Sequence, residues 1–537
     1  MLGGARVVLT GNAGEATRST EPKLAPSGAS VPHTAPDRPV NPPGARSRRR
    51  WAVVRCFLSA ASVASALAGC VAVGPSFKTP AGPTGGIYTR TALPATTAAA
   101  SGALGRAQRF VAAPHVAPEW WRAFGSRELD AWVDRALRTN PTLVAAAATL
   151  REAREIYLAR AGSTLYPTVG ANFGTTREEI TGAMFGQPQI PQETFTLATA
   201  SAAVNYDFDL FGGNRRALEA LAAQTHYARF ELVGARLMLA ADVVTAAFGQ
   251  AQFAAQIDAV RAILASQRRE LDIAREGVAI GTASSADVLA LRTEVEQTRA
   301  TLPPLRNELE QADHLLAVLV GRAPSAADVP RFSLRDFILP ARLPVVVPSE
   351  LVRQRPDVQA ATALLHAATA QYDVAVSALF PKIDLSASLG SAALSAGALF
   401  GPASMIWSLA GALAQPLFNA GLKPAADAAE ENLQAVGASY RQTVLRALQG
   451  VADALRQCQN DAQALTRQSA AYASALRSLA LVQGQYRVGA ASYLQWLDAD
   501  RQLQQIRIAL VAARAARLAD SAALYQAMGG GALVRRH

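Results

Sequence analysis

Cysteine is nearly absent from this sequence: the 537 residues contain only 3 Cys, too few for a disulfide framework. Aromatic residues make up 6% of the chain and charged residues 17%, while half of the residues are hydrophobic. The apolar half is therefore mostly Ala, Leu and Val, which favour closely packed helices, and a fully disordered chain is excluded. The six His form no short metal-ligand pair, and the GxSxG, Walker and GxGxxG motifs do not occur. We therefore expect neither an enzyme nor a protein with a metal or cofactor.

Positive charge is concentrated near the N-terminus. The formal net charge is +11, and residues 1–69 hold nine of the 52 basic residues but only three of the 41 acidic ones. The remainder carries +5, which is too diffuse to predict a nucleic-acid partner. Residues 1–46 are rich in Pro, Gly, Ser, Ala and Arg and show no apolar period, so they cannot build a core. We suspect that they belong to an over-extended gene model.

A targeting segment follows this extension. A cluster of Arg between Arg46 and Arg55 precedes an uncharged run over 56–73, the arrangement of a secretory signal peptide. At 18 residues the run also reaches the lower limit for a membrane-spanning helix, which is the alternative interpretation. We favour the signal peptide because Ala, Ser and Gly dominate the run, and because Leu67-Ala68-Gly69-Cys70 resembles the lipobox of bacterial lipoproteins. The sequence thus predicts an N-terminal extension with a lipoprotein signal peptide over 1–69, lipidation of Cys70, and a lipidated segment over 70–125.

The rest of the chain repeats itself at an interval of about 210 residues. Three short anchors recur in the same order, at separations of 214, 207 and 208 residues. They are Leu165-Tyr166-Pro167 with Leu379-Phe380-Pro381, Asp209-Leu210-Phe211-Gly212-Gly213 with Pro416-Leu417-Phe418-Asn419-Ala420-Gly421, and Gly281-Thr282-Ala283-Ser284 with Gly489-Ala490-Ala491-Ser492. We predict an internal duplication with structural repeats over 126–340 and 341–531, followed by a tail over 532–537.

Each repeat contains a long helical stretch, over 213–280 and over 421–488, both 68 residues long. Apolar residues recur along both with a period of 3.5, which predicts coiled-coil seams in helices about 100 Å long. Cys458 falls on one seam, where we expect a small core residue. Each stretch ends at a Gly turn with a capping signature, so we predict hairpins with tips at 281–284 and 489–492. Pro303-Pro304 should break the returning helix of the first repeat only.

Between the opening helix and the long helix of each repeat, the apolar period becomes two residues. Alternation over 169–174 and 204–210, and again over 383–390 and 407–413, predicts two strands of about ten residues in each repeat. An apolar face toward lipid and a polar face toward a lumen would suit a transmembrane β-barrel, with a soluble sandwich as the alternative. Four strands cannot close a barrel, because open edges in lipid leave backbone groups unsatisfied. The chain should therefore oligomerise.

Six motifs occur in order along the chain. They are Val73-Gly74-Pro75-Ser76-Phe77-Lys78-Thr79-Pro80, Trp120-Trp121-Arg122-Ala123-Phe124-Gly125, Asp209-Leu210-Phe211-Gly212, Pro348-Ser349-Glu350-Leu351, Arg355-Pro356-Asp357 and Gly529-Gly530-Gly531. Together they resemble the lipoprotein branch, of the NodT type, of TolC-like outer-membrane efflux factors. The resemblance implies a mainly α-helical homotrimer with a transmembrane β part. Each protomer would give four strands to one twelve-stranded β-barrel, which continues as a long periplasmic α-helical barrel.

The resemblance also implies a function and a location. The protein would be a passive exit duct, for drugs or other small toxic compounds, of a tripartite pump. Its partners would be a periplasmic adaptor, an inner-membrane transporter of the resistance-nodulation-division (RND) type and outer-membrane lipid. In the lipoprotein pattern, Ala72 rather than Asp implies sorting to the outer membrane. The alternatives are a periplasmic coiled-coil adaptor lipoprotein and the outer-membrane channel of a type I secretion system. Family selectivity lies mainly in the pump, so the sequence does not name the cargo.

Relatives in this family close the periplasmic end of the tunnel with residues just after the second hairpin tip. The family pattern matches Gly489, Tyr493, Leu494, Leu497 and Asp498. The resemblance implies that Leu494 forms an apolar constriction and that Asp498 forms an acidic ring. The alternatives are helix packing for Leu494 and an exposed ion pair with Arg501 for Asp498. Gln495, where some relatives carry a second Asp, is expected to cap the helix with Ser492 instead.

Overall fold

The computed structural model describes residues 73–531, apart from positions 84, 182, 184, 185, 187, 188, 190 and 327. The chain divides into a unit over Met1–Gly69 and a unit over Cys70–His537, and all of the described residues belong to the second unit. The signal peptide, the lipidation site Cys70 and the tail over 532–537 lie outside the described residues.

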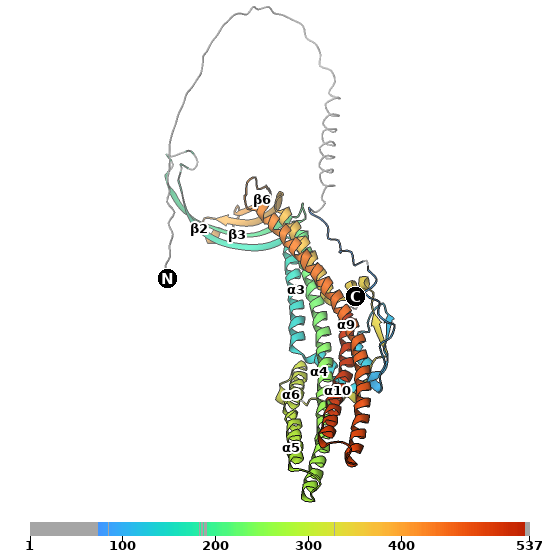
Figure 1. Ribbon diagram of the computed structural model, residues 1–537. Helices are drawn as coiled ribbons and strands as arrows, with labels where there is room; N and C mark the ends of the chain where they lie inside the picture. The colour runs from blue at the N-terminus through green and yellow to red at the C-terminus, as the bar shows by residue number, and fades with distance from the viewer. Residues whose placement is uncertain are drawn as a thin grey trace, which may run out of the picture. The chain divides into compact units, whose positions relative to one another are not determined.

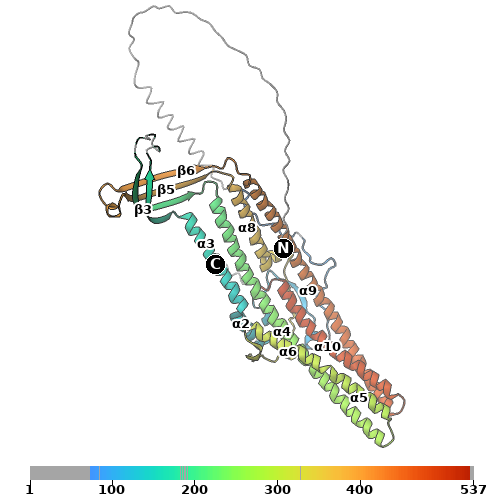
Figure 2. The same cartoon turned by 90° about the vertical axis from the view of Figure 1, so that its left-hand side faces the viewer.

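Two series of elements succeed one another, each made of helices, two long strands, a long helix and a returning helix. The first series is α2 (Arg127–Thr139), α3 (Pro141–Leu165), β2 (Thr168–Ile180), β3 (Glu193–Phe208), α4 (Gly213–Ala279), α5 (Ser285–Ala300) and α6 (Leu302–Leu319). The second is α7 (Pro348–Gln354), α8 (Pro356–Ser377), β5 (Lys382–Ala393), β6 (Met405–Ala414), α9 (Leu422–Arg487) and α10 (Tyr493–Ala527). Within this unit the four long strands lie at one end of α4 and α9, and the hairpin tips lie at the opposite end (Figures 1 and 2).

Both predicted hairpins are confirmed, together with the way their turns are built. α4 has 67 residues and α9 has 66, so each is about 100 Å long at 1.5 Å per residue. Gly281 and Gly489 take positive φ angles of 79° and 75° at the two turns, which side chains with a Cβ rarely adopt. Ser284 and Ser492 then open the returning helices as N-caps, each in a complete capping box.

The predicted asymmetry between the returning helices is also confirmed. In the first hairpin, α5 ends at Ala300 and α6 begins at Leu302, with Pro303 and Pro304 in its first turn. Proline is tolerated there, because the first turn of a helix has no intrahelical acceptor for its N–H groups. In the second hairpin, α10 runs unbroken for 35 residues.

The coiled-coil seam of α9 is buried in its middle and open toward the tip. Val451, Leu455, Cys458 and Leu465 are at most 1% exposed, whereas Leu476 is 49% exposed. Burial raises the pKa of the Cys458 thiol to about 12, so this residue is an unreactive core side chain, as predicted. The seam is exposed near the tip because less of the protomer packs against the hairpin there.

The long strands form one antiparallel sheet in the order β2-β3-β5-β6. β3 and β5 are neighbours, so the sheet joins the two series of elements. The strands of the first series, with 13 and 16 residues, are longer than the predicted ten, and β3 ends at Phe208 rather than continuing to Leu210. It ends there because the Asp209 carboxylate accepts hydrogen bonds from the backbone N–H groups of Asn214 and Arg215, which caps α4.

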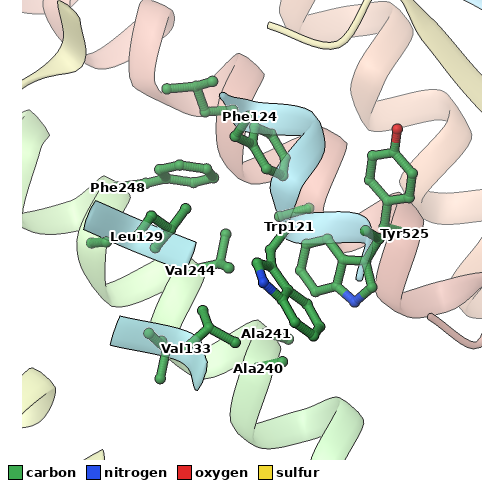
Figure 3. Close-up of a cluster of buried hydrophobic side chains, with 14 of the residues drawn as sticks. Trp121, Phe124, Leu129, Val133, Ala240, Ala241, Val244, Phe248 and Tyr525 are labelled. Carbon is green, nitrogen blue, oxygen red and sulfur yellow. The ribbon is translucent and has the colours of Figure 1, made fainter. Parts of the chain in front are cut away.

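A compact core lies beside the long helices, where the sequence suggested only helix-on-helix packing. The short 3₁₀-helix η2 (Trp120–Phe124) inserts its aromatic side chains between α2, α4 and α10 (Figure 3). Trp120 stacks on Tyr525 with ring centroids 5.6 Å apart, and Phe124 meets Phe248 edge-on at 4.9 Å. A small parallel sheet of β1 (Arg109–Ala112) and β4 (Arg342–Val345) lies next to this core. The motif around Trp120 therefore serves packing.

Candidate functional site

The four-stranded sheet has one apolar and one polar face. Residues paired directly across strands share a face, and Val169, Val204, Ala387 and Leu409 succeed one another across the sheet in this way. The same face carries large apolar side chains that are exposed, namely Val169, Phe173, Val204, Phe208, Leu385, Leu389, Trp407, Leu409 and Leu413. An exposed apolar surface of this extent indicates contact with a membrane or with another protein.

The opposite face is mostly polar. Asn205 pairs with Thr168 on one side and Ser386 on the other, and Ser388 shares a hydrogen bond of 2.8 Å with Ser408. Apolar residues on one face and polar ones on the other are typical of strands that separate lipid from a water-filled lumen. β2 and β6 are the outer strands, and within the described residues each has one edge without a strand partner.

The predicted gate residues lie on the first turns of α10, next to the tip of the second hairpin. Leu494 is 62% exposed, and Asp498, one helical turn further along, has a side chain that is 64% exposed. Asp498 lies 3.7 Å from Nη1 of Arg501, so the structure contains the ion pair that was the alternative to a gate role for this residue. Both side chains are therefore free of the protomer's own core. Gln495 accepts a hydrogen bond of 2.7 Å from the backbone N–H of Ser492, which confirms its predicted capping role.

The other side of the same turns packs against the first hairpin. Leu497 is 2% exposed and joins a cluster of apolar residues from α4 and α5. Arg501 donates from Nε to Glu294 of α5 over 2.5 Å, and Gln267 of α4 donates to Gln504 over 3.3 Å. α10 thus presents two residues outward while three others tie it to the first hairpin.

A buried acid accompanies these contacts. Asp500 is 6% exposed and accepts a hydrogen bond from Gln504. Burial, together with the nearby carboxylates of Glu270 and Glu294, raises its pKa to about 7. Sequence reasoning missed Asp500 and Glu294, because only the packing of α10 on α4 and α5 brings them together. One feature of the sequence could have pointed to this polar contact, namely Gln267, which interrupts the apolar seam of α4.

Comparison with known proteins decides the family. The family model described as "Outer membrane efflux protein" matches residues 132–322 and 347–530. The chain belongs to this family.

Relatives in this outer membrane efflux protein family align with most of the chain. The pyoverdine export outer membrane protein OpmQ of Pseudomonas aeruginosa is 30% identical over 420 residues, which cover 77% of this chain and 87% of OpmQ. The cation efflux system protein CusC of Escherichia coli O6:H1 is 32% identical over 422 residues, covering 77% of this chain and 88% of CusC. The solved structure of the outer-membrane channel OprN superposes with a TM-score of 0.76 at 26% identity, covering 86% of this chain and 99% of OprN.

This membership fixes the general role of the chain. It is an outer-membrane channel that serves as the exit duct in efflux and reaches into the periplasm. The family is one of transport proteins, and it favours the channel over the alternative of a periplasmic adaptor. The sheet with its apolar face is the part suited to the membrane, and the long hairpins are the part suited to the periplasm.

Proposed function

We propose that three copies of this chain form the exit duct of a tripartite efflux pump of the RND type. The observation that supports this proposal best is the open sheet of four strands. A backbone edge exposed to lipid costs several kcal/mol per unsatisfied group, so outer strands such as β2 and β6 need partners in a membrane. If β6 of each copy pairs with β2 of the next, three copies close a barrel of twelve strands.

In this arrangement the polar face lines the lumen and the long helices continue the wall into the periplasm. A matched pair of substitutions in β6 tests it. Leu409→Arg would place a charge on the lipid face, which costs about 2–4 kcal/mol near the middle of a bilayer. Ala410→Arg would place the same charge on the polar face, because Ala410 pairs with Ser386.

The measurement is the yield of heat-modifiable trimer in outer-membrane fractions, read on gels of unheated and boiled samples. We expect Leu409→Arg to reduce the trimer strongly and Ala410→Arg to leave it close to the unsubstituted level. Equal losses from both substitutions would contradict the assignment of the faces, and a monomer in the unheated sample of the unsubstituted chain would contradict the trimer.

We also propose that acyl chains on Cys70 anchor the duct to the outer membrane, and that a periplasmic adaptor and an RND transporter complete the pump. Several acyl chains on one Cys suffice for stable anchoring, since each buried CH₂ contributes about 0.8 kcal/mol. OpmQ and CusC are named for different cargos, pyoverdine and cations, although both are similarly identical to this chain. We therefore assign no cargo.

At the periplasmic end, we propose that Leu494 and Asp498 of the three copies form the gate. Their exposure supports this, because the protomer's own core covers neither side chain and each can approach its two counterparts around a threefold axis. The test is the single-channel conductance of a Leu494→Ala and Asp498→Ala double variant in planar bilayers, which we expect to exceed that of the unsubstituted channel. The matched control is Leu289→Ala, since Leu289 on the first hairpin is also 62% exposed. An unchanged conductance of the double variant would exclude these residues as the gate.

A further inference from the structure

The segment over residues 97–108 precedes β1 and belongs neither to the sheet of long strands nor to the gate-bearing turns. We call it the N-terminal loop. It begins and ends at one contact, in which the backbone N–H of Thr97 donates to the carbonyl of Gln108 over 2.9 Å. The backbone N–H of Gln108 donates in return to the Thr97 hydroxyl, also over 2.9 Å. Both residues are buried.

A fully buried arginine of α10 binds the two ends of this loop. Nη2 of Arg517 donates to Oε1 of Gln108 over 2.7 Å and to the Thr97 hydroxyl over 3.2 Å. The Nε2 atom of Gln108 donates to the hydroxyl of Ser521 on α10 over 2.9 Å and to the carbonyl of Pro340 over 3.0 Å. Pro340 lies two residues before β4, so the same amide ties α10 to the small parallel sheet. We call Thr97, Gln108, Arg517 and Ser521 the clamp.

The clamp is a poor device for stability alone. Arg517 has no exposed surface, and its Nε and Nη1 atoms have no hydrogen-bond acceptor within the part of the chain that the structure describes. Asp520, three residues further along α10, is buried too, and burial together with the carboxylate of Asp461 raises its pKa to about 8. Asp520 is therefore mostly protonated at neutral pH and offers Arg517 no full charge. Such a buried guanidinium costs stability, but its planar shape fixes the position of the helix that carries it.

α10 is packed unevenly along its length. Of the residues that it buries, all but Leu497 and Asp500 lie over 510–525. Leu494, at the proposed gate, and Arg517, in the clamp, are 23 residues apart, which is about 35 Å at 1.5 Å per residue. Because α10 is one unbroken helix, a tilt of about 10° at the clamp would move the gate end by about 6 Å. The direction of α10 at the clamp therefore decides where the gate residues lie.

We propose that the N-terminal loop positions the gate from this distance. Arg517 and Gln108 are the positioning residues, and they hold the far end of α10 so that Leu494 and Asp498 converge on the threefold axis when the duct is at rest. This inference rests on the proposed gate. Loosening the clamp lets α10 tilt away from its resting direction, so that the gate residues of the three copies no longer meet. The duct then opens more often without any change at the gate itself.

A substitution of Gln108 tests the clamp without touching α10. Gln108→Met keeps the length of the side chain but removes an acceptor of Arg517 and the donor to Ser521. Losing a hydrogen bond to a charged donor shifts a two-state equilibrium by about tenfold or more. The open probability of single channels in planar bilayers should therefore rise by about that factor. Gln108→Glu, which still offers an oxygen to Arg517, should keep the open probability low.

The matched control is a buried amide that ties the other hairpin. Nδ2 of Asn140 donates to the carbonyl of Leu319 at the end of α6 over 2.9 Å, and α6 carries no gate residue. Asn140→Ala should lower the unfolding temperature, as Gln108→Met does, but leave the open probability within about twofold of the unsubstituted channel. Adding Gln108→Met to the Leu494→Ala and Asp498→Ala variant should raise the open probability no further, because the gate is then already lost.

Two results in bilayers would overturn the clamp: an open probability of Gln108→Met no higher than that of Asn140→Ala, or an equally raised open probability in Gln108→Glu. Amide hydrogen exchange over 515–525 separates the clamp from the gate. It should accelerate in Gln108→Met and not in Asn140→Ala, and equal exchange in the two variants would also overturn the clamp. If exchange accelerates only in Gln108→Met while the Leu494→Ala and Asp498→Ala variant keeps its conductance, the gate is overturned and the hold on α10 stands.

Discussion

The two hairpins share one plan and pack in different ways. The first builds an apolar cluster of its own from α4, α5 and α6, with the buried members Ile257, Val260, Leu264, Leu271, Leu291, Val295 and Leu302. The second contributes Leu497 to that cluster. Its own tip is held by three aromatic rings, in which Tyr486 stacks on Trp496 at 5.3 Å and Tyr493 meets both edge-on. The first hairpin thus has an apolar core of its own. The second hairpin packs against that core through the turns of α10 that carry the proposed gate.

The largest effect is expected from removing the Leu497 side chain, through which the second hairpin packs against the first. Leu497→Ala should destabilise the protein by about 2–5 kcal/mol, since it leaves a cavity in the cluster. Leu494→Ala, three residues earlier on the same helix, should change the stability by less than about 0.5 kcal/mol, because Leu494 is exposed. Thermal denaturation of the two variants measures the difference, and equal midpoints would show that the second hairpin does not depend on the first.

Asp500, the buried acid between the hairpins, should make their packing depend on pH. The pKa of Asp500 in the folded protein, about 7, exceeds its ordinary value of 3.8, so the native state binds this proton more tightly than the unfolded chain. Stability should therefore fall as the pH rises from about 4 to 7, by about 1.4 kcal/mol for each unit of pKa difference. Asp500→Asn should raise the unfolding temperature at pH 8 and leave it nearly unchanged at pH 4, where the ordinary carboxyl of the unfolded chain is still largely protonated. A rise of equal size at both values would contradict a charged Asp500 as the cause.

The smallest expected effect distinguishes the two tips. Ser284→Ala and Ser492→Ala each remove a capping box, at a cost of about 1 kcal/mol. Amide hydrogen exchange in the first turn of α5 or α10 should accelerate about fivefold. Ser439→Ala, inside α9, removes no cap and serves as the control. If the exchange of the α10 turn did not change in Ser492→Ala, the capping box would not be what holds the gate-bearing turn in place.

Periodicity and turn chemistry predicted the elements of this fold because both are local. The tips at Gly281 and Gly489, the break before Pro303 and the four strands all result from residues within a few positions of one another. The predicted end of β3 was wrong because the Asp209 carboxylate accepts a hydrogen bond from the backbone N–H of Arg215 at the start of α4. An alternation of apolar and polar residues does not reveal such a cap. In the same way, the sequence pointed to Leu494 and Asp498 through the family pattern, but not to Asp500 or Asp520. Both of these acids are buried by elements far away in the chain.

The pairing of β3 with β5 has a consequence for the order in which this molecule is built. Paired residues such as Ala198 with Ala393 and Phe208 with Ile383 are 195 and 175 positions apart. In a chain that emerges from its N-terminus, β2 and β3 are therefore available before β5, with the whole first hairpin between them. A pair of strands alone is marginally stable, so insertion into the membrane should begin only after β5 and β6 have been made. The helices between β3 and β5 in the sequence thus also delay the completion of the sheet.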